Sequence, residues 1–168
     1  EYVRQGSNWQ VFKNNLKTLG DAIGNIPNCK HYLKIMSVLN LLNITHLDSL
    51  KKFSKKIVSD YLPPRWPTES IEIVWQPCLM PHEISLTHFG SDFVAVFKES
   101  ITNYLEQGIQ DNEKTFFTTI LEQLDANIQQ PTSEKQKDML NKWIQMNADY
   151  FNNLGAFAKL YPEFSKLL

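Results

Sequence analysis

The sequence predicts a mainly α-helical fold, either an antiparallel helical bundle or a short helical-repeat stack of about six helices. Apolar residues recur at three- and four-residue steps through most of the 168 residues, which is the spacing of amphipathic helices. The expected helices also come in pairs joined by short turns, and short turns favour antiparallel neighbours. A proline-rich stretch at about residues 63–90 interrupts this pattern.

The composition is that of a globular domain. The chain is 42% hydrophobic and 21% charged, with a net charge of −1, which argues against a disordered or fibrous protein. We expect residues 1–168 to form one helical domain, excised from a larger protein. The balanced charge argues against a dedicated nucleic-acid-binding domain. The sequence contains no run of 18 apolar residues, so it predicts no transmembrane segment.

The first half of the chain is expected to contain three helices, at 8–26, 28–42 and 46–62. The first has an apolar stripe, and Pro27 ends it. In the second, apolar residues occupy most of the circumference, which predicts a deeply buried helix. In the third, an apolar stripe faces away from a group of lysines.

Three more helices are expected at 91–109, 112–130 and 133–154. Ser91 is a good N-cap residue for the first, and Thr132 or Ser133 for the last. The six helices are expected to pack around a core drawn from all of them. Its predicted members are Phe12, Leu16, Tyr32, Leu39, Leu50, Phe53, Phe97, Ile101, Phe117, Leu121, Trp143 and Tyr150.

The irregular insertion at about 63–90 contains five of the eight prolines. Within it, residues 70–76 alternate between apolar and polar side chains, which indicates a short strand. Residues 84–87 form a second, weaker extended run. The two runs could pair as a short β-hairpin, or the whole stretch could be a long ordered crossover.

A basic helix face is the first candidate binding feature. Lys51, Lys52, Lys55 and Lys56 stand at positions i, i+1, i+4 and i+5 of one expected helix, and Arg65 follows. Lysines at this spacing share one side of a helix. They could bind an acidic partner segment; phosphates of nucleic acid or of an anionic lipid are the less favoured ligands. The alternative is a solvated helix face without a binding role.

The second candidate feature is a proline- and tryptophan-rich arm. Trp66 lies between prolines close to Arg65, and Trp75 lies in the alternating run. Trp and Arg are enriched in the residues that contribute most to binding energy at protein interfaces. We expect an extended arm that contacts another chain, unless both tryptophans fold back over a helix seam.

These features favour a non-catalytic protein–protein interaction or scaffold module of an intracellular protein. Its expected partner is a protein with an acidic or extended segment, bound by Lys51, Lys52, Lys55, Lys56, Arg65, Trp66 and Trp75. The chain has no CxxC, HExxH or glycine-rich phosphate loop. We therefore expect no enzymatic activity, no metal and no cofactor.

Two other functions stay open. A secreted four-helix, cytokine-like ligand would use the glycosylation sequon at Asn43 and a disulfide between Cys29 and Cys78. A small enzyme or ligand-binding domain would be centred on Cys78 and His82, because a thiol beside an imidazole can act as a nucleophile.

Overall fold

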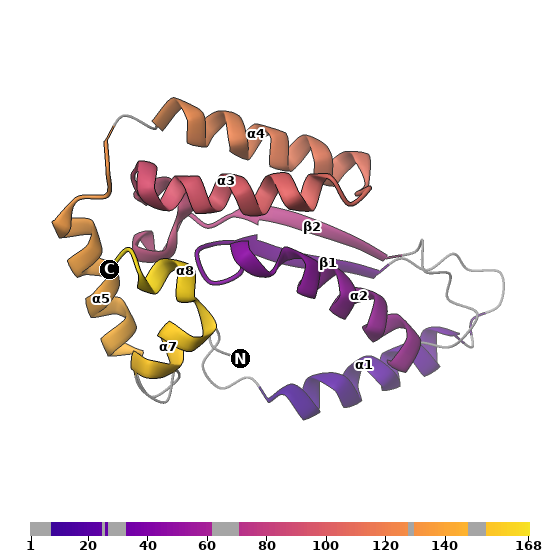
Figure 1. The fold of residues 1–168 in the computed structure, drawn as a ribbon. Coiled ribbons are helices and arrows are strands. Elements are labelled where there is room, and N and C mark those ends of the chain that lie inside the picture. The colour runs from indigo at the N-terminus through magenta and orange to yellow at the C-terminus, as the bar shows by residue number, and fades with distance from the viewer. Residues whose placement is uncertain (1–7, 25, 27–32, 62–70, 128–129, 148–153) are drawn as a thin grey trace. The chain divides into compact units, whose positions relative to one another are not determined.

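The computed structural model describes residues 8–24, 26, 33–61, 71–127, 130–147 and 154–168. They form a mainly helical protein with a small sheet of two parallel strands (Figure 1), which confirms the predicted helical class. The helices are α1 (Trp9–Gly24), α2 (Leu47–Tyr61), α3 (Ser91–Leu105), α4 (Asp111–Asn127), α5 (Glu134–Met146), α7 (Leu154–Leu160) and α8 (Pro162–Ser165). The strands are β1 (Leu33–Leu39) and β2 (Ile71–Pro77), and 3₁₀ turns lie at Ile44–His46, His82–Ile84 and Leu86–His88.

The chain divides into two compact units. The first comprises residues 1–36 and 48–74, and the second residues 37–47 and 75–168. The first unit therefore contains α1, nearly all of α2 and the beginnings of both strands. The second contains α3, α4, α5, α7, α8, the 3₁₀ turns and the ends of the strands.

The predicted helix at 28–42 is wrong over its described part, because residues 33–39 form strand β1. Alternate side chains along β1 are inward and partly or fully buried, beginning with Leu33 and Ile35. The intervening residues point outward, and Met36 is 63% exposed. The apolar residues here fit both a helical and a two-residue period, and strand pairing decides between them.

The strand expected at 70–76 is confirmed as β2, but the hairpin is wrong. β2 pairs in parallel with β1. The N–H of Cys78 donates a 3.0 Å hydrogen bond to the Leu39 carbonyl at one end of the sheet, and Lys34 and Glu72 form a 3.2 Å ion pair at the other. Parallel strands need a long crossover, and α2 lies in that connection. Ile84 ends one 3₁₀ turn and Leu86 begins the next, with Ser85 between them, so residues 84–87 form no strand.

An asparagine-rich turn ends β1. The Asn43 side chain accepts a 2.9 Å hydrogen bond from the Asn40 N–H and donates a 2.8 Å bond to the Val38 carbonyl. Asn40 in turn accepts a 2.8 Å bond from the N–H of Leu42. Asparagine side chains of this kind replace backbone partners in tight turns, which explains why the chain leaves the sheet here.

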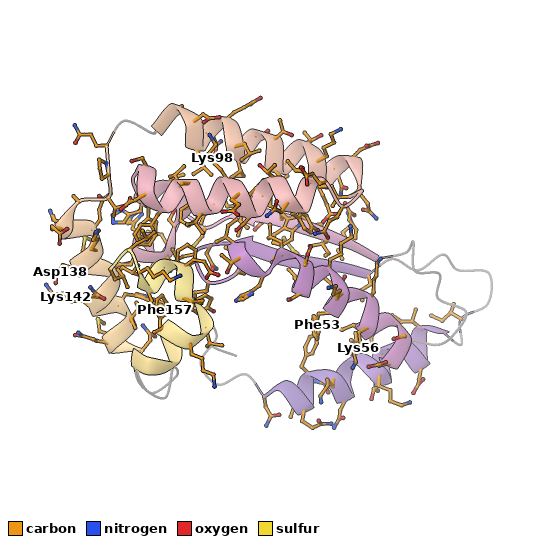
Figure 2. All side chains as sticks on the ribbon, viewed as in Figure 1. Phe53, Lys56, Lys98, Asp138, Lys142 and Phe157 are labelled. Carbon is orange, nitrogen blue, oxygen red and sulfur yellow. The ribbon has the colours of Figure 1, made fainter. Side chains whose placement is uncertain are left out.

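The core of the first unit joins its two helices. Leu16 of α1 and Ile57 of α2 are buried together, and Figure 2 shows the Phe53 side chain extending from α2 toward α1. The partly buried hydrophobic residues around this pair are Ile23, Leu33, Ile35 and Phe53. Leu16 is therefore a core residue as predicted, whereas Phe12 is 48% exposed and was placed wrongly.

The core of the second unit is rich in aromatic rings. Phe93 stacks on Phe89 at 4.6 Å and on Phe164 at 5.7 Å between ring centroids. Phe97, Ile101 and Phe117 are buried as predicted, as is Leu39 in its strand, while Tyr32 and Tyr150 lie outside the described residues. Helices α3 and α4 lie side by side (Figure 1).

Two segments far apart in sequence interlock at the start of α3. The Asp92 carboxylate accepts hydrogen bonds from the N–H of Thr132, at 2.9 Å, and from the Thr132 hydroxyl. The Ser91 N–H donates a 2.9 Å bond to the Gln130 carbonyl. A Cβ atom on Gly90 would lie 2.3 Å from the Thr132 nitrogen, so only glycine permits this close approach.

The predicted last long helix is shorter than expected. Ser133 caps α5, as one of the two residues predicted for that role. Its side chain accepts from the Gln136 N–H at 3.3 Å, and the Gln136 side chain accepts from the Ser133 N–H at 2.8 Å. This reciprocal pair is a capping box. α5 ends at Met146, and residues 148–153 lie outside the described part of the chain.

Candidate functional site: the basic face of α2

Four lysines of α2 form what we call the basic face: Lys51, Lys52, Lys55 and Lys56. Lys52, Lys55 and Lys56 are exposed and Lys51 is half-buried. The opposite side of α2 carries the buried residues Ser54 and Ile57. Each residue turns the helix by about 100°, so these buried positions fix the direction in which the lysines project.

The charges of the basic face are only partly neutralised. Lys56 forms an ion pair with Asp60 at 3.9 Å, one helical turn away, and both side chains are substantially exposed to solvent. In the described part of the chain, no hydrogen bond or ion pair engages the ammonium groups of Lys52 and Lys55. The ammonium groups of these two lysines, at the centre of the face, are therefore open to an external ligand.

The exposed side of α2 is polar throughout the residues whose side chains are described. Its exposed members are Ser49, Lys52, Lys55, Lys56, Ser59 and Asp60. The larger apolar residues Leu50 and Phe53 are half-buried, on the flank that packs inward. The face thus offers ammonium and hydroxyl groups, without an exposed apolar anchor among the described side chains.

The proline- and tryptophan-rich arm is not confirmed as a surface feature. Arg65 and Trp66 lie outside the described residues. Trp75 is 6% exposed, and its ring packs edge-on against Phe117 at 5.2 Å. The expectation that Trp75 lies on an exposed arm is therefore wrong, because its side chain is part of the core of the second unit.

Trp75 belongs to a buried polar cluster that the sequence analysis missed. Its Nε1–H donates to the Glu113 carboxylate at 3.1 Å, and the Tyr104 hydroxyl donates to the same oxygen at 2.7 Å. Glu113 is 5% exposed. Its position in the first turn of α4 gives no hint of burial, because acidic residues are common there on the surface. The cluster positions Trp75, near the end of β2, against the α3–α4 pair within the second unit.

The structure does not bring Cys78 and His82 together as a catalytic pair. The Cys78 thiol is buried and free, and it donates a 3.4 Å hydrogen bond to the Met80 carbonyl. Burial raises the pKa of this thiol, an effect that the backbone of Met80 only partly opposes, and the raised pKa disfavours the reactive thiolate. His82 is exposed.

A small cavity of about 10 Å³ borders Cys78. Residues Leu39, Ser85, Leu86 and Leu124 are among those that line it, and His82 is not. A cavity needs roughly 10–15 Å³ to hold one water molecule. This space therefore matches a single water at most, and it offers no room for the substrate or ligand of the Cys78-centred alternative.

The secreted alternative depends on the sequon at Asn43 and on a disulfide between Cys29 and Cys78. The Asn43 side chain is used in the turn that ends β1, and Ile44 of the sequon is fully buried. Cys78 is a free thiol, and Cys29 lies outside the described residues. The amide nitrogen that would carry a glycan is thus a hydrogen-bond donor within the fold.

The histidine-containing turns do not gather metal ligands. Among the residues that the structure describes, no group of three His, Cys, Asp or Glu side chains is arranged to hold a metal ion. Burial lowers the pKa of His88, an effect that Glu83 opposes and His82 reinforces.

No helix within the described ranges of the chain is long and apolar enough to cross a membrane.

Comparisons of the chain with protein-family models, with curated proteins and with solved structures find no match.

Proposed function

We propose that this chain is a non-catalytic protein-interaction module of an intracellular protein, and that it binds an acidic segment of a partner protein through the basic face of α2. The observation that carries the proposal is the pair Lys52 and Lys55. Both are exposed, both lie at the centre of a four-lysine face, and neither is engaged by a carboxylate in the described residues.

Electrostatics explains why such a face suits an acidic partner. Like charges three or four residues apart on a helix repel each other and cost a few tenths of a kcal/mol per pair. A partner carboxylate placed between Lys52 and Lys55 would relieve this repulsion and gain two attractions. The ion pair of Lys56 with Asp60, at 3.9 Å, is too long and too exposed to compete strongly for a partner carboxylate.

The charge of the remaining chain favours a protein partner over nucleic acid or a membrane. The whole chain carries −1 and the four lysines carry +4, so the other residues carry −5. A long polyanion would extend beyond the basic face and meet this acidic remainder. A membrane-bound helix also needs apolar residues beside its lysines, and the described exposed side chains of α2 include none.

Charge reversal tests this proposal. Hexaglutamate with a fluorescent label serves as the acidic probe, and binding is followed by fluorescence anisotropy at low salt. We expect the double variant Lys52→Glu with Lys55→Glu to weaken binding at least tenfold and to leave the melting curve nearly unchanged. Glu and Lys have similar helix propensities, so α2 should persist in the variant.

The matched control reverses two exposed lysines elsewhere, Lys114→Glu on α4 with Lys135→Glu on α5. It changes the net charge by the same amount and should bind the probe within about twofold of the wild type, because neither lysine belongs to the basic face and salt screens charges that the probe does not contact. Equal weakening in both double variants would show that net charge governs binding, and the proposal would then be wrong.

A further inference from the structure

The basic face lacks the residue types that usually provide affinity at a stable, specific protein interface. The cores of such interfaces are enriched in Tyr, Trp, Phe, Met and Arg and depleted in Lys. On the described exposed side of α2, lysines are accompanied only by serines and Asp60. Lys56 forms an ion pair with Asp60 and still has 73% of its side-chain surface exposed. Desolvation of these groups in a dry interface would be costly.

We infer that the basic face recognises its partner by charge alone, and that the partner presents a short run of consecutive Asp or Glu residues in a flexible, extended segment. This inference rests on the proposed function and specifies the partner further. A folded partner with an apolar anchor would need a complementary apolar site, and the described exposed side chains of α2 offer none. A flexible acidic run needs only carboxylates within reach of the ammonium groups.

The geometry of α2 sets the length of that run. Lys51 and Lys56 are five residues apart, which corresponds to about 7.5 Å along the helix axis. An extended chain advances about 3.3–3.6 Å per residue, so two to three residues lie directly over the face. Lysine stems are long and mobile and reach beyond both ends. We therefore expect about four to six consecutive acidic residues to saturate the face.

Recognition by exposed charges has a distinct dependence on salt. Exposed charges are screened over about 10 Å at 0.1 M ionic strength and over about 3 Å at 1 M. Binding by Lys52 and Lys55 should therefore weaken steeply as salt is added. An interface with a buried apolar anchor would keep most of its affinity, because hydrophobic burial does not depend on charge screening.

The test compares acidic peptides of equal charge on the full chain. One probe is labelled hexaglutamate, and the other has the same six Glu residues interspersed with three Phe. We expect the two dissociation constants to agree within about threefold and to rise at least tenfold between about 50 mM and 300 mM NaCl. A diglutamate probe should bind at least tenfold more weakly than hexaglutamate. Dodecaglutamate should bind each basic face little more tightly than hexaglutamate does.

The outcomes separate the two proposals. Tighter binding of the Phe-containing peptide, by tenfold or more and with little effect of salt, would overturn recognition by charge alone and leave the interaction module intact. Failure of every acidic peptide to bind at low salt would overturn the proposed function itself. Much tighter binding of a single-stranded RNA hexamer or of phosphatidylserine vesicles, lost in Lys52→Glu with Lys55→Glu, would overturn the assignment to a protein partner.

Discussion

The indole N–H of Trp75 donates a 3.1 Å hydrogen bond to the buried carboxylate of Glu113, which also receives the Tyr104 hydroxyl at 2.7 Å. Both donors bind the same carboxylate oxygen, and the N–H of Gln110 approaches the other at 3.4 Å. None of the ion pairs formed by the described residues involves Glu113. Neutral donors therefore compensate the burial of this carboxylate, and its loss would remove an acceptor that two buried donors share.

Removal of the Glu113 carboxylate should destabilise the second unit. Glu113→Ala removes the acceptor that Trp75 and Tyr104 share, and we expect a loss of about 2–4 kcal/mol in the free energy of unfolding. Glu113→Gln keeps an acceptor oxygen and should cost about 1 kcal/mol. Urea denaturation followed by circular dichroism measures both. The exposed Glu122→Ala on the same helix is the control; if it matches Glu113→Ala, the cluster has no special role.

The two glycines Gly90 and Gly108 should respond differently to alanine. At Gly90 a Cβ atom would lie 2.3 Å from the Thr132 nitrogen and 2.4 Å from the Gln130 oxygen, so the backbone must move. We expect Gly90→Ala to cost about 2–3 kcal/mol. Gly108 has open space around it but a φ of +65°, so Gly108→Ala should cost about 1 kcal/mol from backbone strain alone. Thermal melts that rank the two in the opposite order would contradict the interlock.

Asp92 should make the fold sensitive to acid. Burial raises the pKa of Asp92, but hydrogen bonds from the Thr132 hydroxyl and N–H and from the Phe93 N–H outweigh burial and hold the pKa below its ordinary value of 3.8. As pH falls, the unfolded chain then takes up this proton before the folded chain does. The stability contributed by Asp92 is present above pH 3.8 and is lost as pH falls through the folded-state pKa.

The variant Asp92→Asn isolates this contribution. Its amide oxygen can still accept from Thr132, but the side chain no longer titrates. We expect the difference in unfolding free energy between wild type and variant to shrink as the pH is lowered below 3.8. Urea denaturation at a series of pH values measures the difference. A difference that stays constant down to pH 2 would show that the folded-state pKa of Asp92 is not depressed.

The Cys78 thiol should be slow to react in the folded protein. It is buried, and burial raises its pKa, so both access and thiolate fraction are low. In a Cys29→Ser background we expect alkylation by iodoacetamide to be at least about 100-fold slower than for free cysteine, and to become fast in denaturant. Fast labelling of the native protein, read by intact mass, would revive Cys78 as a nucleophile.

The helical part of the fold follows from the sequence because its apolar periodicity is long and regular. Phe93, Phe97 and Ile101 repeat at helical spacing, and all three are buried in α3. Strand β1 could not be predicted this way. Its seven residues are mostly apolar, and a short apolar run does not distinguish a strand from a buried helix. Its partner β2 arrives more than thirty residues later, so local sequence carries no sign of their pairing.

The candidate site was predictable only where it depends on one helix. The spacing of Lys52 and Lys55 places them on one side of α2, and the structure leaves both exposed. Trp75 shows the limit of such reasoning. Its residue type suggested an interface, but its burial depends on Glu113 and Tyr104, which come from elements elsewhere in the chain. Tertiary partners of this kind give no local signal in the sequence.

An NMR titration of the isotopically labelled full chain with hexaglutamate shows most directly whether the basic face binds an acidic segment. If the basic face is the binding surface, the largest amide shift changes map to residues 49–56 of α2, and they vanish in the Lys52→Glu with Lys55→Glu variant. Shift changes centred on another element, or unchanged shifts in the variant, would contradict the assignment of the basic face as the binding surface.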